Sequence, residues 1–237
     1  MAQLTAPQIE LRKFATQSRA EVQQRFFKTG PGEYGHGDIF IGVTVPDTRA
    51  VCKKFSNIEL SEIEKILKSE IHEDRLLGLL FVVQKYQKAR AQSEKLKILN
   101  FYLKNKDRIN NWDLVDVTVH KIVGEFALEF DQQKIIQKLS KSKRHWDKRM
   151  AVISTYAFIR KGKVNLTYSL AEKFLNETED LMHKATGWML REAGKKNPNR
   201  LRDFLKKHGK KMPRTMLRYS IEKFSEAERK KILTETK

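Results

Sequence analysis

The stretch RLLGLLFVVQKYQ, residues 75–87, is largely apolar, and its conformation decides the fold class of the chain. An apolar run of this kind fits either a buried strand or a buried helix. Its length exceeds that of most strands, and it lies between segments with helical periodicity. We therefore predict that residues 75–87 form a buried helix.

Amphipathic segments alternate with apolar ones along the chain. ELSEIEKILKSE (59–70), SEKLKILNFYLK (93–104) and LTYSLAEKFLNE (166–177) each place apolar residues on one helical face. These faces comprise Leu60, Ile63, Ile66 and Leu67, then Leu96, Leu99 and Leu103, then Leu166, Leu170, Phe174 and Leu175. Ser93 is a possible N-cap of the second helix. The pattern predicts pairs of one outward-facing and one buried helix.

These helix pairs recur with a nearly constant period. Apolar second helices begin near Arg75, Leu114, Arg149, Lys184 and Arg214, at steps of 39, 35, 35 and 30 residues. This period resembles that of HEAT and armadillo repeats. We predict an all-α fold: an α-solenoid of HEAT-like antiparallel helix pairs with a concave basic groove, forming a single domain over residues 1–237. The register predicts that Arg149, Lys184 and Arg214 project into this groove.

The chain is strongly basic, and the excess is concentrated in its second half. The formal net charge is +19. Residues 1–132 hold 20 Lys and Arg against 18 Asp and Glu, whereas residues 133–163 hold 10 against 1 and residues 181–237 hold 17 against 6. Such a surface attracts polyanions, of which nucleic acid is the commonest in a cell. A solvated, solubilising surface is the alternative.

Several functional classes find no support in the sequence. No run of 18 apolar residues suggests a membrane span. MAQLTAPQIELRKF lacks the ordered regions of a signal peptide, so a cytoplasmic location is expected, with a nuclear one as the alternative. Cys52 is the only cysteine, so no internal disulfide or cysteine zinc site is expected. The six histidines show no metal-binding spacing. KTGPGEYGHGDIFIGVTVP (28–46) lacks the features of a P-loop and predicts a turn or a disordered tip.

Two short segments carry candidate site residues. In NNWDLVD (110–116), Trp112 and Asp116 share a helical face, and Asp113 lies near the helix start, where it favours a capping role. Trp112 and Asp116 form either a functional pair or a core residue beside a salt-bridge partner of an arginine. HKATGWMLREAGKK (183–196) places a tryptophan within a cationic stripe, which suits contact with sugar, base or backbone, or packing under aliphatic stems. This stripe comprises Lys184, Trp188, Arg191 and Lys195.

Four motifs together resemble those of the AlkD-like DNA alkylation repair glycosylases. They are FIGVTVPDTR, NWDLVD, WDKRMAVIS and HKATGWMLREAGKKNP, in the family's order and spacing. The resemblance implies a solenoid of HEAT-like repeats that removes positively charged N3- or N7-alkylated purines from DNA without metal or cofactor. It implies that Trp112 and Asp116 are catalytic and that Trp188 and Arg149 lie near the lesion. The family's N-terminal pocket aromatic, typically tyrosine, falls on Phe26.

Two hypotheses follow from these observations. The first is a monofunctional alkylpurine DNA glycosylase, acting as a monomer on double-stranded DNA with alkylated bases. The second is a non-catalytic repeat module that binds nucleic acid or a partner protein. Both predict a basic groove, and only the first requires Asp116 to face that groove, with Trp112 and Trp188 nearby. The backbone-binding residues predicted are Lys148, Lys184, Arg191, Arg214 and Arg218.

Overall fold

The structure is a computed structural model that describes residues 3–236. Its helices pack into two compact units: an N-terminal unit that ends at Leu114 and a C-terminal unit that begins at Val115. The short helix α7 (Trp112–Asp116) contains this boundary. A single repeat domain over residues 1–237, with one concave groove, stays a prediction.

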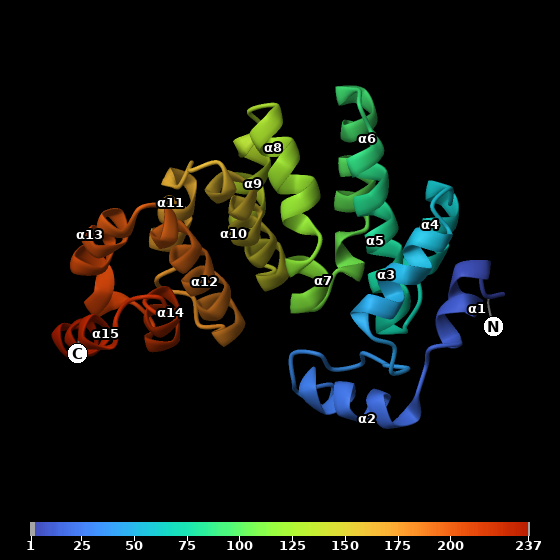
Figure 1. The fold of residues 1–237 in the computed structure, drawn as a ribbon, viewed down its shortest axis with the longest axis horizontal. Helices are drawn as coiled ribbons and strands as arrows, with labels where there is room; N and C mark the ends of the chain where they lie inside the picture. Colours follow the sequence, from blue (N-terminus) through green and yellow to red (C-terminus); the bar gives the residue numbers. More distant parts are fainter. Residues whose placement is uncertain (1–2, 237) are drawn as a thin grey trace. The chain divides into compact units, whose positions relative to one another are not determined.

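Helix α5 (His72–Lys88) is the centre of the N-terminal unit (Figure 1). Every residue from 72 to 83 is buried, which confirms the buried helix predicted for residues 75–87. The helix packs against α3, α4 and α6. The other helical elements of the unit are α1 (Ala6–Arg12), α2 (Gln17–Phe26), α3 (Val45–Lys54), α4 (Leu60–Leu67), α6 (Gln92–Lys104) and the 3₁₀ turn η1 (Lys106–Arg108).

The start and the buried face of α6 differ from the sequence prediction. The N-cap is Ala91, and the Glu94 side chain accepts hydrogen bonds from the backbone N–H groups of Arg90 and Ala91, so Ser93 does not cap the helix. Leu96 is 43% exposed. The face that packs inward instead carries Ile98, Leu99 and Tyr102. Tyr102 is fully buried, whereas Leu103 is only half-buried.

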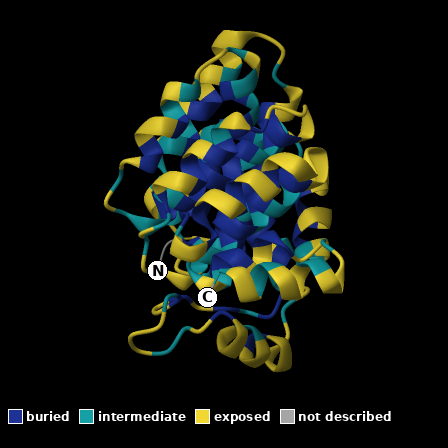
Figure 2. Cartoon of the chain, turned by 90° about the vertical axis from the view of Figure 1, so that its left-hand side faces the viewer, coloured by how far each residue is buried: buried dark blue, intermediate teal, exposed yellow. Residues whose placement is uncertain are grey.

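The C-terminal unit stacks three pairs of helices. The first helices are α9 (Gln133–Ser140), α11 (Asn165–Lys173) and α13 (Pro198–His208), and the second are α10 (His145–Arg160), α12 (Asp180–Lys196) and α14 (Arg214–Ser220). Helix α10 packs against its partner α9 and against the next second helix, α12. Helix α12 packs in turn against its partner α11 and against α14. Figure 2 shows buried turns in dark blue enclosed by exposed turns in yellow. This successive packing is the helix-pair arrangement that the sequence predicts.

Three further elements complete the C-terminal unit. A π-helical turn, η2 (His120–Gly124), continues directly into α8 (Glu125–Glu129). The 3₁₀ turn η3 (Gly209–Lys211) connects α13 to α14, and α15 (Glu226–Glu235) follows α14. Gly124 lets η2 approach α10 closely, since a Cβ there would lie 2.4 Å from the carbonyl oxygen of Ser154. The backbone after α7 is thereby fixed against α10.

The all-α prediction is confirmed for the part of the chain that the structure describes. Within residues 3–236 the extended pairing is limited to an isolated parallel bridge between Ile39 and Ile71. None of the helices there combines the length and the apolar character needed to cross a membrane.

Candidate active site

Trp112 lies in a cluster of aromatic rings in the N-terminal unit. Its ring stacks on Phe27, with centroids 5.1 Å apart and planes at 18°, and it meets Phe26 edge to face at 5.9 Å. Phe27 also stacks on Phe40 at 4.8 Å. Phe26 is 63% exposed, and Trp112 is half-buried. The cluster is therefore anchored in the core at one end and presents aromatic surface to solvent at the other, and it brings together two of the predicted residues.

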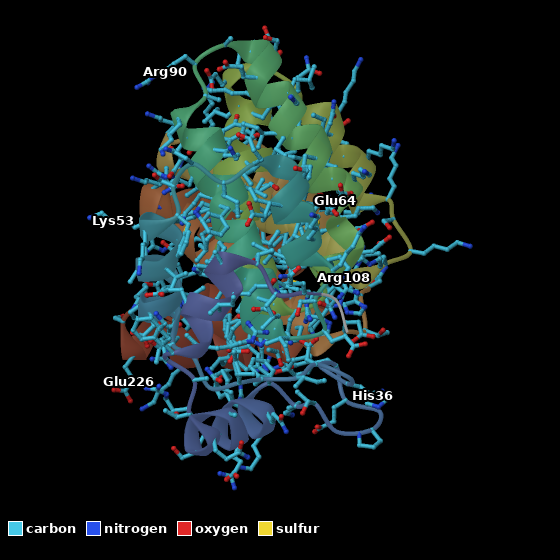
Figure 3. All side chains as sticks on the ribbon, turned by 90° about the vertical axis from the view of Figure 1, so that its right-hand side faces the viewer. His36, Lys53, Glu64, Arg90, Arg108 and Glu226 are labelled. Atoms are coloured by element: carbon cyan, nitrogen blue, oxygen red, sulfur yellow. The ribbon has the colours of Figure 1, made fainter. Side chains whose placement is uncertain are left out.

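Tyr34, from the glycine-rich segment, joins this cluster. Its hydroxyl accepts a hydrogen bond from Trp112 Nε1 at 3.3 Å and donates one to the backbone oxygen of Phe26 at 3.3 Å. Gly35 permits this close approach, because a Cβ there would lie 2.3 Å from the Phe27 carbonyl oxygen. The segment forms a series of turns, with His36 on its outer edge (Figure 3). Sequence reasoning assigned the segment to a turn and missed Tyr34, whose one signal was an aromatic residue among glycines.

A buried network of charged side chains supports the cluster from below. The His72 ring contacts Asp38 through Nδ1 (3.1 Å to Oδ2) and Asp113 through Nε2 (2.8 Å to Oδ2). Arg75 pairs with the other oxygen of Asp38. The His72 ring itself stacks on Phe40 at 4.4 Å. Asp113 does lie in the first turn of α7, as predicted, but its carboxylate binds His72, so it ties α7 to α5.

Both carboxylates act on the charge of the His72 ring. Burial opposes the charged imidazole, but the Asp113 charge and the hydrogen bonds to both aspartates outweigh it and raise the pKa of His72 to about 9. Burial alone would raise the pKa of Asp38, but the His72 hydrogen bond and the Arg75 charge outweigh it and lower this pKa to about 2. At neutral pH the network therefore holds an imidazolium between two carboxylates.

Asp116, at the end of α7, is held by an arginine of the C-terminal unit. Arg149 Nε lies 2.9 Å from Oδ1, and Nη2 lies 2.7 Å from Oδ2. Arg149 Nη1 donates to the backbone oxygen of Leu181. The Arg149 residue is only 5% exposed. Its guanidinium is thus directed onto Asp116 and α12 rather than freely into solvent, and the two-point contact fixes the orientation of the carboxylate.

Trp188, on α12, is half-buried beside a second aromatic group. Its ring centroid lies 6.3 Å from that of Tyr156 on α10, and Tyr156 meets His120 edge to face at 5.4 Å. His120 Nδ1 in turn lies 3.0 Å from the backbone oxygen of Asp116. Gly187, which precedes Trp188, allows α12 and α14 to touch, since a Cβ there would lie 2.5 Å from the Met216 carbonyl oxygen. Trp188 is therefore carried by a closely packed, well-defined helix.

The predicted backbone-binding residues differ in their acidic contacts. Lys148 pairs with Glu177 at 2.6 Å, Lys184 pairs with Asp180 at 2.7 Å, and Arg191 pairs with Glu222 and Glu192. Arg214 donates to the backbone oxygens of Leu233 and Thr236. Arg218 is exposed on α14 and has no acidic partner among residues 3–236. Partly exposed ion pairs are weak, so these lysines and arginines can exchange their partners for phosphate groups.

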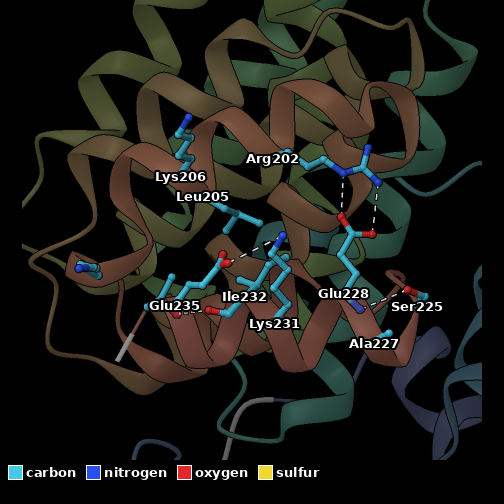
Figure 4. Close-up of a pocket in the computed structure, with 11 residues that line it drawn as sticks. Arg202, Leu205, Lys206, Ser225, Ala227, Glu228, Lys231, Ile232 and Glu235 are labelled. Atoms are coloured by element: carbon cyan, nitrogen blue, oxygen red, sulfur yellow. Dashed lines mark hydrogen bonds and ion pairs between the residues drawn. The ribbon is translucent and has the colours of Figure 1, made fainter.

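A cavity of about 810 Å³ lies between α13 and α15 (Figure 4). Leu205 and Ile232 contribute apolar surface, and Arg202 pairs with Glu228 at its edge. None of the predicted site residues lines it. This cavity therefore does not contribute to the candidate site.

Comparisons with known proteins concern the fold and the family of the chain. The family model described as a DNA alkylation repair enzyme matches residues 8–224. A solved structure described as a predicted DNA alkylation repair enzyme from Enterococcus faecalis is similar with a TM-score of 0.72, at 18% identity over 90% of this chain and 97% of that one. At this identity the likeness shows the fold. No curated protein matches the chain. Because the family model spans most of its length, the chain belongs to the family of DNA alkylation repair enzymes.

Proposed function

We propose that this protein is a monofunctional DNA glycosylase that excises positively charged N3- or N7-alkylated purines from duplex DNA. The observation that carries the proposal is the oriented carboxylate of Asp116, held at both oxygens by Arg149. It follows Trp112 by four residues on the same short helix. Membership of the DNA alkylation repair family supports DNA as the substrate.

The main group that the proposed reaction needs from the protein is a carboxylate. Alkylation at N3 or N7 makes the purine cationic, so it departs as a neutral base without protonation by a general acid. Positive charge then develops on the deoxyribose, and a preorganised carboxylate stabilises it. The reaction as proposed needs neither a metal nor a cofactor. Arg149 acts in this proposal through Asp116, as a positioning residue beside the lesion.

Partly exposed aromatic rings are proposed to contact damaged DNA. Trp112 and Phe26 offer partly exposed faces in the N-terminal unit, and Trp188 offers one in the C-terminal unit. The electron-rich face of an aromatic ring attracts a cation such as an alkylated purine or an electron-poor sugar. Trp112 is fixed for this role by Tyr34 and Phe27. The hydroxyl that Phe26 lacks is present nearby on Tyr34.

Lysines and arginines are proposed to hold the DNA backbone. Their attraction for phosphate positions the duplex without reading its sequence. The protein is proposed to act as a monomer, on DNA in the cytoplasm. The residues with this role are Lys148, Lys184, Arg191, Arg214 and Arg218.

A non-catalytic DNA-binding module is the second candidate function. The observation that favours it is the completeness of the Asp116–Arg149 pair, in which both carboxylate oxygens already have a cationic partner. An ion pair of this geometry also serves purely to join α7 to α10. In that case the protein binds alkylated DNA but releases no base from it.

A base-release assay distinguishes the two functions. The protein is incubated with methylated duplex DNA, and free 3-methyladenine and 7-methylguanine are separated chromatographically and quantified. The glycosylase proposal predicts release of at least one of them above the rate without protein. Asp203→Asn, at an exposed position on α13, serves as a control that keeps full release. Tight binding without release of either base would favour the non-catalytic module.

A further inference from the structure

His120 opens the π-helical turn that follows α7. A π turn inserts an extra residue into a helix, and such turns occur frequently at functional sites. His120 follows Asp116 by four positions, and its ring contacts the Asp116 backbone oxygen. The close approach of Gly124 to α10 holds this turn in place.

The contact between His120 and Asp116 fixes the tautomer of the ring. The backbone oxygen of Asp116 can only accept a hydrogen bond, so His120 Nδ1, at 3.0 Å, carries a proton and donates it. Burial, together with the charges of Lys121 and Arg160, lowers the pKa of His120 to about 4, against the effect of the Asp116 hydrogen bond. At neutral pH the ring is therefore uncharged, and Nε2 carries a lone pair.

That lone pair is available for an interaction. Within residues 3–236, His120 makes a hydrogen bond through Nδ1 and an edge contact with the Tyr156 ring at 5.4 Å, and Nε2 has no hydrogen-bond partner. Tyr156 also borders Trp188, one of the proposed lesion-binding residues. His120 is half-buried rather than enclosed in the core. A hydrogen-bond acceptor thus lies close to Asp116 and next to the Tyr156–Trp188 pair.

The proposed reaction has a step for which Asp116 is poorly placed. A water molecule that attacks the sugar must lose a proton as its oxygen bonds to C1′. Both oxygens of Asp116 are engaged by Arg149, which limits their capacity to bind and deprotonate that water. A neutral histidine is the commonest residue for such a transfer.

We propose that His120 Nε2 binds the attacking water and accepts its proton, while Asp116 stabilises the cationic sugar. This inference rests on the proposed glycosylase function. The C1′–N bond breaks, and its electron pair leaves with the purine and cancels the purine's positive charge. The water oxygen forms the new bond to C1′, and its proton moves to Nε2 and then to solvent. The products are the free alkylated base and an abasic site.

Two substitutions separate the two ring nitrogens. In His120→Asn the side-chain amide can still donate to the Asp116 carbonyl from the Nδ1 position, but nothing accepts at Nε2. In His120→Gln the longer side chain places an oxygen near the Nε2 position. Release of 7-methylguanine is measured in single-turnover conditions, with DNA affinity and thermal unfolding as parallel readouts. His208→Asn is the matched control, because His208 is also a largely buried histidine of the C-terminal unit with a pKa lowered by burial.

We expect the rate of 7-methylguanine release to be highest in wild type, lower in His120→Gln and lowest in His120→Asn. General acid–base groups contribute on the order of 10²–10⁴ in rate, and a loss of about 10- to 100-fold is expected for Asn because the leaving group is already activated. DNA affinity should stay unchanged, and Gln should remain within about 10-fold of wild type. Any result in which the Asn protein is not slower than the Gln protein overturns the inference.

Two further outcomes complete the test. If the Asn protein does not fold, the folded Gln protein is compared with wild type alone: release within about 10-fold of wild type supports the role of His120, and a larger loss overturns it. If wild type releases no base, the glycosylase function fails and this inference fails with it. Release by wild type together with an unaffected Asn protein overturns only the inference about His120.

Discussion

Arg149 directs its guanidinium at Asp116 and the Leu181 carbonyl, with both charged side chains largely buried. Removing one partner of such a pair leaves a charge in a poorly solvated place, which costs about 3–5 kcal/mol. We expect Arg149→Ala to lower the free energy of unfolding by about 3 kcal/mol. Chemical denaturation measures this loss.

The neighbouring Lys148 provides the control for this prediction. It pairs with Glu177, and the side chains of both are 21% exposed. Partly exposed pairs contribute about 1 kcal/mol or less, so Lys148→Ala should have a small effect. Equal losses of stability in the two variants would show that Arg149 is not the buried half of an ion pair.

The sequence singles out candidate site residues, but it does not identify most of the side chains that contact them. Asp116 and Trp112 stand out through local spacing and motif resemblance. The contacts that define their environments join residues far apart in sequence: Arg149 and Asp116 are separated by 33 positions, His72 and Asp113 by 41, and Tyr34 and Trp112 by 78. Helical periodicity carries no information on such pairs, since they depend on how helices pack.

Helix α12 carries two glycines that face different surroundings. A Cβ at Gly187 would meet backbone, 2.5 Å from the Met216 oxygen, whereas a Cβ at Gly194 would first meet the end of the flexible Leu201 side chain at 2.4 Å. Alanine gains about 1 kcal/mol of helix propensity at either position. We expect the backbone clash to dominate in Gly187→Ala, for a net loss of about 1–3 kcal/mol.

Thermal unfolding of the two alanine variants tests this contact between α12 and α14. Gly194→Ala should lose less stability than Gly187→Ala, because Leu201 can change its rotamer. The account of how Trp188 is positioned fails if Gly187→Ala is at least as stable as Gly194→Ala.

The His72 network should make stability depend on pH. The pKa of His72 is about 9 in the folded state and about 6.5 when unperturbed. A raised pKa means that its stabilising contribution is complete below pH ~6.5 and disappears as the pH rises through about 9. The free energy of unfolding of wild type should therefore fall by roughly a few kcal/mol across this window.

His72→Gln isolates this contribution. The variant keeps a polar side chain near Asp38 and Asp113 but cannot titrate. Unfolding is measured by denaturant at several pH values from 6 to 9.5, and the difference between the two proteins should shrink as the pH rises. Parallel curves for wild type and His72→Gln would contradict a charged imidazole in the network.

At the level of helices, hydrophobic periodicity predicted the structure correctly where apolar residues dominate a segment. Residues 76–83 are continuously apolar, and the length of the run favoured a buried helix over a strand. The predicted buried face of α6 was wrong at Leu96, which is 43% exposed, whereas Ile98 and Tyr102 are buried beside Leu99. Leucine spacing alone weights these residues incorrectly.

Because the net charge of the molecule is +19, its affinity for DNA should fall as the salt concentration rises. Removing a side chain that binds one phosphate group flattens the slope of log K against log salt by roughly 0.9. We expect Arg214→Ala with Arg218→Ala to weaken binding to all duplexes alike and to reduce the slope by about 1.8. Lys97→Ala, at an exposed position in the nearly neutral first half, should leave the slope unchanged. The same slope in all three proteins would make these arginines part of a solvated surface only.

Asp116→Asn tests the central claim most directly, because it removes the negative charge and keeps the shape of the side chain. The decisive measurement is the single-turnover release of 7-methylguanine from methylated duplex DNA by wild type and variant, at a temperature where both are folded. Loss of a preorganised electrostatic contact typically lowers a rate on the order of 10²–10³, and the spontaneous lability of the alkylated base can make the loss smaller. We predict a clear fall in release while DNA affinity holds or rises slightly, since one negative charge has left the protein. Equal release by both proteins would contradict the assignment of Asp116 and favour the non-catalytic function.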